Sequence, residues 1–385
     1  MDKFFGEVED PRSGQNIGFP LQEILLIALV TFLCAGQTYE DMVDTGRAKL
    51  DFLRRFFPYR KGVPSADTFR YVLMALDPKS FGDAFAKWME FLHEHVEGLV
   101  AVDGKCCRGS ASAGKSPLNI VNAYCRERGV VLACIDCPDK GNEITVLPEL
   151  LSMLELNDCV VSLDAMGCQK AVAKQIVGQK GDYLLMLKGN QGNLHKDVKE
   201  FFQAHEESDP EFQEPDFTAD VYRHQESGHG RHCRWKVVAT NDFCPGLKRY
   251  RRDWKGLESV VMVECHRTEN GKNSYERRFA ITSLKPDAAR LADLTRGHWC
   301  VENNNHWSLD VAFAEDACRA RAGHSAKNLG TLRRLSLNVV KHAQKTFANR
   351  RSIKRMLRKA AMEDDYLEQL LHTGLKIFPA DSNPA

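Results

Sequence analysis

Two short apolar runs, each followed at once by an aspartate, are the feature that most limits how this chain can fold. Leu99-Val-Ala-Val precedes Asp103, and Val160-Val-Ser-Leu precedes Asp164. Runs of this length and composition are typical of buried strands, so each aspartate is expected where a strand leaves the core. A glycine follows at Gly104 and Gly167. Because such acids and glycines also mark ordinary turns, a turn is the better account of either aspartate taken alone.

A third acid stands in a stretch that is rich in His, Trp, Asn and acidic residues. If residues 296–316 form a helix, Trp299, Glu302 and His306 share one face, because they are three and four residues apart. A packing helix normally carries aliphatic side chains there, so the mixture indicates contact with a metal ion, a nucleic acid or a substrate. A core helix with a few satisfied polar groups is the alternative.

Three carboxylates from separate segments suggest a site for divalent cations. Mg²⁺ is held by a few carboxylates while it keeps several waters, and two such ions can activate a water and stabilise the leaving oxygen of a phosphodiester. We therefore predict that Asp103, Asp164 and Glu302 bind two Mg²⁺ ions, with Mn²⁺ as a substitute. The rival third acids are Asp310, Glu315 and Asp316.

Length and composition indicate an intracellular protein of more than one module. The chain has 385 residues, beyond the size at which a single core usually stops growing. Its 13 cysteines are scattered and no signal peptide is recognisable, so we expect reduced thiols and a cytoplasmic location. The longest apolar run, Ile24 to Cys34, is too short for a membrane span and fits a buried helix.

A zinc site was also considered. Cys134 and Cys137 have metal-like spacing, and a second group comprises His224, His229, His232 and Cys233. A second CxxC pair is missing, so structural thiols and a polar hairpin are the better interpretation.

The pattern of segments predicts an α/β protein with a helical N-terminal domain. Residues 1–97 are expected to be helical, and residues 98–200 with 290–345 to form a core with a mixed sheet. Residues 201–289 are expected to form a β-rich insertion, in which Asn270-Gly271 predicts a hairpin turn. The basic tail, 346–385, continues a helix that carries Arg333, Arg334 and Lys341. Such a helix can neutralise phosphates, although net charge is only +1 and a solvated basic face is the alternative.

Four ordered motifs match a known family. The first motif is Asp103-Gly-Lys together with Arg108-Gly-Ser, and the second is Asp164-Ala-Met-Gly-Cys-Gln. The third is Asp182-Tyr-Leu-Leu together with Leu187-Lys-Gly-Asn-Gln, and the fourth begins at His298-Trp-x-x-Glu302. With Pro64-Ser-x-Asp-Thr-Phe they resemble DDE transposases of bacterial insertion sequences, in the branch of H-repeat-associated proteins. The resemblance extends from that N-terminal block to about residue 345.

The resemblance implies a ribonuclease H-like catalytic core in which Asp103, Asp164 and Glu302 bind the two metal ions. It implies hydrolysis that frees a 3′-hydroxyl at a transposon end, followed by attack of that hydroxyl on target DNA. Relatives that form a DNA hairpin carry Tyr-x2-Arg-x3-Glu-x6-Lys around the third acid. Here those offsets hold Thr295, His298, Glu302 and Leu309, while Trp299 matches the family's tryptophan.

Several other residues near the motifs are candidate DNA ligands. Trp299 could stack on an extruded base, an interaction worth roughly 1–3 kcal/mol, or could equally be a core indole. The remaining candidates carry basic, amide or imidazole groups beside the expected site: Lys105, Arg108, Lys188, Asn190, Gln191, His298, Asn303 and His306. For each lysine or arginine, a solvated surface position is the alternative.

These observations predict a DNA transposase whose partners are double-stranded transposon ends and target DNA. We expect a homo-oligomer on DNA, no membrane partner and no small-molecule substrate. A catalytically silent or co-opted DNA-binding protein of the same fold, and a metal-dependent nuclease without strand transfer, are the alternatives. The N-terminal helices are the first candidate for reading the DNA end, and the basic tail competes for that role.

Overall fold

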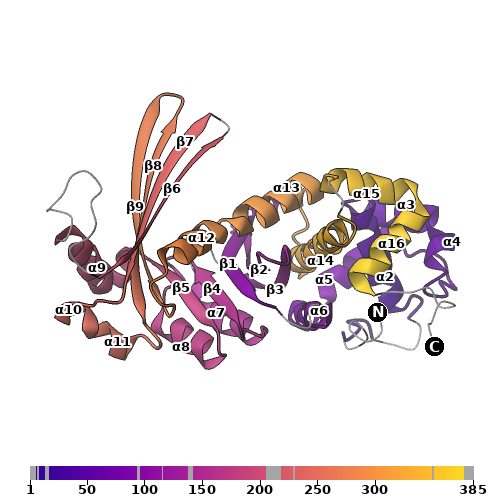
Figure 1. Ribbon diagram of the computed structural model, residues 1–385. Helices are drawn as coiled ribbons and strands as arrows, with labels where there is room; N and C mark the ends of the chain where they lie inside the picture. The colour runs from indigo at the N-terminus through magenta and orange to yellow at the C-terminus, as the bar shows by residue number, and fades with distance from the viewer. Residues whose placement is uncertain are drawn as a thin grey trace, which may run out of the picture. The chain divides into compact units, whose positions relative to one another are not determined.

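The computed structural model covers the whole chain and describes all of it except residues 1–5, 7, 14–16, 93–95, 115, 138–141, 205–217, 229, 349–350 and 377–385. It divides into two compact units (Figure 1). The helical unit comprises Met1–His95, Gly104–Asn142 and Val301–Ala385, and the sheet unit comprises Val96–Asp103 and Glu143–Cys300. Strand β1 (Gly98–Cys107) passes from one unit to the other, with the boundary directly after Asp103.

The helical unit is built around one long helix, α14 (Ser325–Thr346). Helices from both ends of the chain pack against it, together with the antiparallel hairpin of β2 and β3. Their bounds are α2 (Leu21–Leu33), α3 (Tyr39–Ala48), α4 (Leu50–Leu53), α5 (Ala66–Ala75), α6 (Pro78–Leu92), β2 (Leu118–Cys125), β3 (Val130–Cys137), α13 (Trp307–Phe313), α15 (Ile353–Met362) and α16 (Asp364–Leu375). The segments that we expected to be an N-terminal domain and a C-terminal tail thus share one compact unit.

Local sequence signals account for several helix starts. Ser65 caps α5 by accepting a hydrogen bond from the amide of Thr68, as expected of a serine at this position. Asp77 accepts from the amide of Ser80 at the start of α6. The apolar run from Ile24 forms most of α2, in which every side chain from Glu23 to Leu33 is buried. None of the described helices is long and apolar enough to cross a membrane.

The nine-stranded sheet has the order β3-β2-β1-β4-β5-β9-β8-β7-β6. In the sheet unit, β1 pairs parallel with β4 (Cys159–Leu163) and β4 pairs parallel with β5 (Asp182–Leu187). An antiparallel set then follows, comprising β6 (Asp220–Gly228), β7 (Arg231–Thr240), β8 (Ser259–Glu269) and β9 (Lys272–Thr282). Since β9 pairs with β5, the strands of the expected insertion continue the sheet of the core.

Helices complete the sheet unit. They are α7 (Glu143–Ser152), α8 (Lys170–Gly178), α9 (Gly192–Ala204), α10 (Pro245–Lys248), α11 (Tyr250–Asp253) and α12 (Ala288–His298). Helix α12 packs on β4, β6, β7 and β8. Beyond α12, strands β6–β9 project as a long ribbon (Figure 1). Asn270 and Gly271, with φ of 50° and 75°, form the predicted hairpin turn between β8 and β9.

Candidate active site

Asp103 and Asp164 follow neighbouring positions on two parallel strands. The registered pairs of β1 and β4 end at Val102 opposite Leu163, so each aspartate comes one residue later on its own strand. Strand alternation places both on the face that Ser162 occupies. One expectation was wrong, because β1 does not end at Asp103 but continues to Cys107, whereas β4 does end before Asp164.

The turn after β4 fixes the Asp164 carboxylate. Its Oδ1 accepts hydrogen bonds from the amides of Met166 at 3.0 Å and Gly167 at 3.3 Å. A Cβ at position 167 would lie 2.5 Å from a side-chain atom of Leu163, so only glycine allows this close turn. Both backbone amides donate to the same oxygen of Asp164. Because a carboxylate has about four lone-pair sites in all, the Asp164 carboxylate can still accept further bonds.

A second turn is tied to the first by two side-chain amides. Asn190, in the 3-10 turn Gly189–Gln191, donates to the carbonyl of Ala165, and Gln191 donates to the carbonyl of Cys168 at 2.8 Å. The amides that we considered as DNA ligands therefore hold the Asp164 turn in place. Lys188, which precedes them, is exposed.

His298 is buried in the sheet unit, on the same face of the sheet as the two aspartates. Its side chain is 8% exposed, and its Nδ1 lies 2.9 Å from the hydroxyl of Ser162. Burial lowers the pKa of His298; nearby Asp164 opposes this effect and Arg278 adds to it. A neutral imidazole at this place bonds to the hydroxyl of Ser162 on the face that carries the aspartates. Sequence reasoning missed Ser162, whose only signal is a hydroxyl within an otherwise apolar run.

Trp299 is packed between aromatic and basic neighbours. Its ring lies 5.9 Å from that of Trp235, and the guanidinium of Arg278 lies 4.7 Å from its centroid. It contacts the buried core of the sheet unit. This environment favours the core-indole alternative over an open stacking platform.

The predicted helical face around Glu302 was wrong in its geometry. Helix α12 ends at His298, and Val301–His306 form a π-helix before α13 begins. Because a π-helix bonds each residue to the one five positions away, the spacing of three and four no longer aligns side chains. Glu302 and Asn303 are exposed, whereas His306 is mostly buried.

His306 lies inside the helical unit. Its Nε2 is 3.4 Å from the side-chain amide of Asn122 on β2. Burial lowers the pKa of His306 to about 3, and the cations Arg334 and Lys105 act in the same direction. The histidine is therefore neutral at physiological pH.

A buried ionic network accounts for the rival acids and for Lys105. Arg334 is fully buried and lies 2.7 Å from Glu315, which is 1% exposed. Lys105 is 6% exposed and pairs with Asp310 at 2.8 Å and Asp316 at 3.3 Å. Burial alone would lower the pKa of Lys105, but the surrounding carboxylates outweigh it and raise that pKa. Lys105 therefore forms ion pairs inside the helical unit. It was expected at the surface, beside DNA phosphates.

The basic residues of α14 were expected to form an exposed basic face, but two of them are buried. Arg333 is 2% exposed, donates to the carbonyl of Phe313 at 3.2 Å and stacks 5.2 Å from the ring of Phe32. Together with Arg334 it belongs to the interior. Arg108, by contrast, is 82% exposed, with its Nε 3.5 Å from Asp316.

The zinc candidates are structural thiols where they are described. Cys134 and Cys137 are buried in β3, and the 13 cysteines are thiols that form no disulfides. His229 lies outside the described residues. Over the described ranges, no group of three or more His, Cys, Asp or Glu side chains is placed to hold a metal ion.

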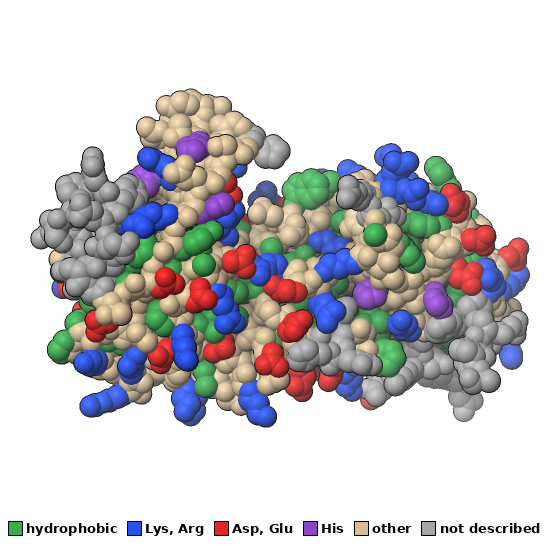
Figure 2. All heavy atoms as spheres, viewed as in Figure 1, with side chains coloured by type: hydrophobic (Ala, Val, Ile, Leu, Met, Phe, Trp, Pro, Cys, Tyr) green, Lys and Arg blue, Asp and Glu red, His purple; other side chains and the backbone are tan. Residues whose placement is uncertain are grey.

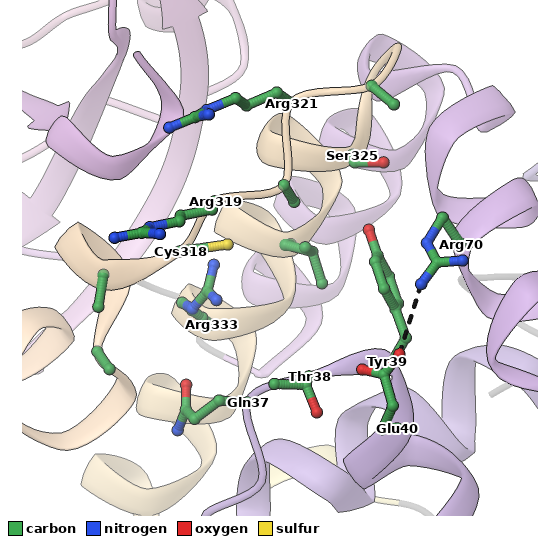
Figure 3. A pocket seen from close by; sticks show the side chains of 15 residues that line it. Gln37, Thr38, Tyr39, Glu40, Arg70, Cys318, Arg319, Arg321, Ser325 and Arg333 are labelled. Atoms are coloured by element: carbon green, nitrogen blue, oxygen red, sulfur yellow. Dashed lines mark hydrogen bonds and ion pairs between the residues drawn. The ribbon is translucent and has the colours of Figure 1, made fainter. Parts of the chain in front are cut away.

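The helical unit also contains a pocket that sequence reasoning missed. Its volume is about 710 Å³, and it is lined by α3, α5, α14 and the segment 314–322. Figure 3 shows Tyr39 inside it, beside Arg70, which pairs with Glu40 at 3.4 Å. Arg319 and Arg321 point away from Tyr39 in the same view. Scattered small residues such as Ala317 and Ala320 gave no signal for it.

Comparison with known proteins gives consistent results. The model of the "DDE_Tnp_1-associated" family matches residues 3–89, and that of the "Transposase DDE domain" family matches residues 94–339. "Putative transposase YncI" of Escherichia coli O157:H7 is 33% identical over 96% of this chain and 93% of its own length. The "H repeat-associated putative transposase YhhI" of Escherichia coli K12 is 33% identical over 94% of this chain and 95% of its own.

Among solved structures, a piggyBac transposase synaptic complex with hairpin DNA aligns with a TM-score of 0.45 and 10% identity. It covers all of this chain and 84% of that one. A likeness at that score does not by itself establish a common fold.

Proposed function

Because the chain belongs to the family of transposases with a DDE domain, we propose that it cuts DNA at the inverted repeats of an insertion sequence and joins the freed end to target DNA. The observation that carries this proposal is the placement of Asp103 and Asp164 one residue beyond paired positions of two parallel strands. Neighbouring parallel strands lie about 4.8 Å apart, close enough for two carboxylates to share a ligand.

The donor set suits a hard divalent cation. Asp103 and Asp164 offer carboxylate oxygens, which Mg²⁺ prefers, and His298 is buried and bonded to Ser162 instead. Glu302 is proposed as the third ligand, since its carboxylate is exposed and π-helices occur frequently at functional sites. Two bound Mg²⁺ ions, or Mn²⁺ in their place, would supply an activated nucleophile and stabilise the leaving oxygen.

The chain's own residues position the acids and receive DNA. The amides of Met166 and Gly167 orient Asp164, and the turn carrying Asn190 and Gln191 supports that loop. Exposed Lys188 follows β5 and is available for a phosphate oxygen, a contact that fixes position and not sequence. Arg108 is the corresponding candidate in the helical unit.

The partners proposed are duplex transposon ends and target DNA, bound by a homo-oligomer that pairs two ends in the bacterial cytoplasm. No small-molecule substrate is part of the proposal.

The test is a cleavage and joining assay with purified protein, Mg²⁺ and a labelled duplex that carries the gene's flanking inverted repeat. We expect Asp103→Asn, Asp164→Asn and Glu302→Ala each to abolish cleavage while end binding persists. Removal of Mg²⁺ by a chelator should have the same result. Asp158→Asn is the matched control, because this exposed aspartate precedes the opposite end of β4 and tolerates the same change of charge.

Three outcomes would decide between functions. Cleavage with joined products, lost in the three variants and kept in Asp158→Asn, supports a transposase with this site. Cut ends that are never joined would indicate a nuclease, and binding without cutting by the wild type would indicate a silent or co-opted DNA-binding protein. Normal cleavage by Asp103→Asn would show that the site assignment is wrong.

A further inference from the structure

Helix α15 of the helical unit is held in place by its apolar face. The buried side chains of this face are Met356, Leu357 and Ala360, and the helix packs against α2, α13, α14 and α16. Ser352 caps the start of α15 by accepting a hydrogen bond from the amide of Arg355. The helix is therefore fixed in the unit, with its other face turned to solvent.

That other face is basic. Lys354, Arg355 and Arg358 are exposed, and these three residues are called the α15 basic face here. None of them forms an ion pair with an acid in the part of the chain that the structure describes. Residues 327–359 contain neither Asp nor Glu. Figure 2 shows Lys and Arg side chains gathered over the position that α15 has in Figure 1.

The acids that follow α15 belong to the start of α16. Glu363 lies 3.1 Å from Lys359, and Asp364 lies 2.6 Å from Lys49. Asp364 and Asp365 are in the first turn of α16, where the helix dipole favours negative charge. These carboxylates therefore have other electrostatic partners than the α15 basic face.

The three cations are placed unfavourably for the helix alone. Lys354 and Arg355 lie in the first turn of α15, where the helix dipole disfavours positive charge. Arg358 is four residues from Lys354 and three from Arg355, so it is a neighbour of both on the helix surface, and like charges at such spacings repel. A bound anion would relieve both effects, which indicates that the α15 basic face has a ligand.

Other cations of the same basic stretch make their contacts inside the helical unit. Arg333 is buried, as described above, and Arg334 is paired with Glu315. Lys341 and Lys345 donate hydrogen bonds to backbone carbonyls. These four side chains are occupied by the fold, in contrast to the α15 basic face.

Two features favour duplex DNA over other polyanionic partners. An amphipathic helix that binds a lipid surface inserts its apolar face, but the apolar face of α15 is already buried in the unit. Proteins that bind single strands stack the bases on aromatic side chains, and α15 contains no aromatic residue. A row of cations without stacking groups suits the backbone of a duplex, which carries two phosphates for each base pair.

We propose that the α15 basic face binds the phosphate backbone of duplex DNA. This inference rests on the proposed function and adds a surface of the helical unit that holds the duplex. Lys354, Arg355 and Arg358 contact phosphate oxygens. Contacts of this kind fix the position of the duplex and carry no sequence information.

The experiment measures binding of a fluorescein-labelled duplex of arbitrary sequence by fluorescence anisotropy, with the full chain and a chelator present so that no cleavage occurs. Wild type is compared with Lys354→Gln/Arg358→Gln, which removes two charges, and with Lys354→Arg/Arg358→Lys, which keeps both. Arg54→Gln/Lys79→Gln is the matched control, because it removes two exposed cations of the same unit that are each paired with an acid. Circular dichroism checks that each variant is folded.

Loss of phosphate contacts should reduce both the affinity and its dependence on salt. Each contact contributes a slope of about −0.9 to the logarithm of the binding constant against the logarithm of salt concentration, so Lys354→Gln/Arg358→Gln should be shallower by about 1.8. The charge-preserving variant and the matched control should keep the wild-type slope. The inference is overturned if the charge-removing variant binds like wild type, if either of the other two variants loses as much slope, or if wild type binds no duplex.

The two proposals can fail separately. A wild type that cleaves repeats normally, with an α15 variant that binds as well as it does, would refute the α15 basic face alone. A wild type that never cleaves, with an α15 variant that still loses duplex binding, would refute the catalytic proposal alone.

Discussion

Two arginines on α14 of the helical unit lie in its core, whereas Arg234 on the ribbon of the sheet unit is exposed. Arg334 on α14 is fully buried against Glu315, and Lys105 is 6% exposed among carboxylates. Arg234 on β7 is exposed, and the acids of its ribbon mostly point to the other side. The comparison shows that a basic stretch of sequence does not by itself identify a DNA-binding surface. The positions of the acidic residues that lie near it in the fold must also be known.

The largest effect that tests this contrast is expected from Arg334→Met. Removing one partner of a buried ion pair typically costs about 3–5 kcal/mol, and here it leaves the buried Glu315 carboxylate with Lys105, 3.9 Å away, as its remaining cation. Urea denaturation monitored by circular dichroism would measure the loss in free energy of unfolding. The double variant Arg334→Met/Glu315→Gln should recover part of it, because the stranded charge is gone. Arg358 is exposed, so Arg358→Met serves as the control. If Arg334→Met lowered the free energy of unfolding no more than Arg358→Met does, the distinction between buried and exposed arginines would be lost.

A smaller effect is expected from pH, because burial, helped by the nearby cations Arg334 and Lys105, keeps His306 neutral. The pKa of His306 in the folded chain is about 3, whereas an unfolded histidine titrates near 6.5. Between these values the unfolded chain binds a proton that the folded chain does not, so stability is complete above about pH 6.5 and is lost as the pH falls.

One unit below the unfolded pKa, this histidine should lower the free energy of unfolding by on the order of 1 kcal/mol. Urea titrations at neutral and mildly acidic pH would compare wild type with His306→Asn. The variant should lose less stability on acidification, because the proton uptake is removed. An identical pH dependence in both proteins would place His306 in a more open environment than the one seen here.

The smallest effect on stability is expected from Arg234→Gln on the ribbon. This side chain is exposed, and surface changes of this kind usually alter stability by less than about 0.5 kcal/mol. Its thermal midpoint should therefore match that of wild type. A marked fall in the midpoint would mean that Arg234 is part of the folded core.

Much of the fold could be predicted from local patterns. The apolar runs before Asp103 and Asp164 form β1 and β4, and α5, capped by Ser65, lies in the segment predicted to be helical. The mixed α/β fold with helical N-terminal segments is confirmed, and the strand order together with the DDE domain match confirms its ribonuclease H-like class. These features depend on neighbours in sequence, so composition and spacing are sufficient to find them.

The features that could not be predicted depend mainly on contacts between residues that are distant in sequence. Lys105 pairs with Asp310, and Arg334 contacts Asn122, across about 200 residues in each case. No periodic pattern reports such pairs, so both cations were taken for surface residues. The π-helix at Val301–His306 also has no signal in the sequence, and it changed which side chains around Glu302 share a face.

The division into segments 1–97, 98–200 with 290–345, 201–289 and 346–385 stays a prediction about function. Compactness groups them differently, because α15 and α16 pack with α14 and because β9 joins β5. Whether the N-terminal helices read the repeat is likewise a prediction, which deletion of residues 1–97 followed by a binding assay would test.

The two amides of the Gly189–Gln191 turn have a mechanical consequence. Asn190 and Gln191 hold the carbonyls of Ala165 and Cys168, so Lys188 and Asp164 are coupled through a short, stiff linkage. In the proposed complex, a phosphate bound by Lys188 would therefore act on the loop that carries Asp164 through these two hydrogen bonds, without passing through the rest of the sheet.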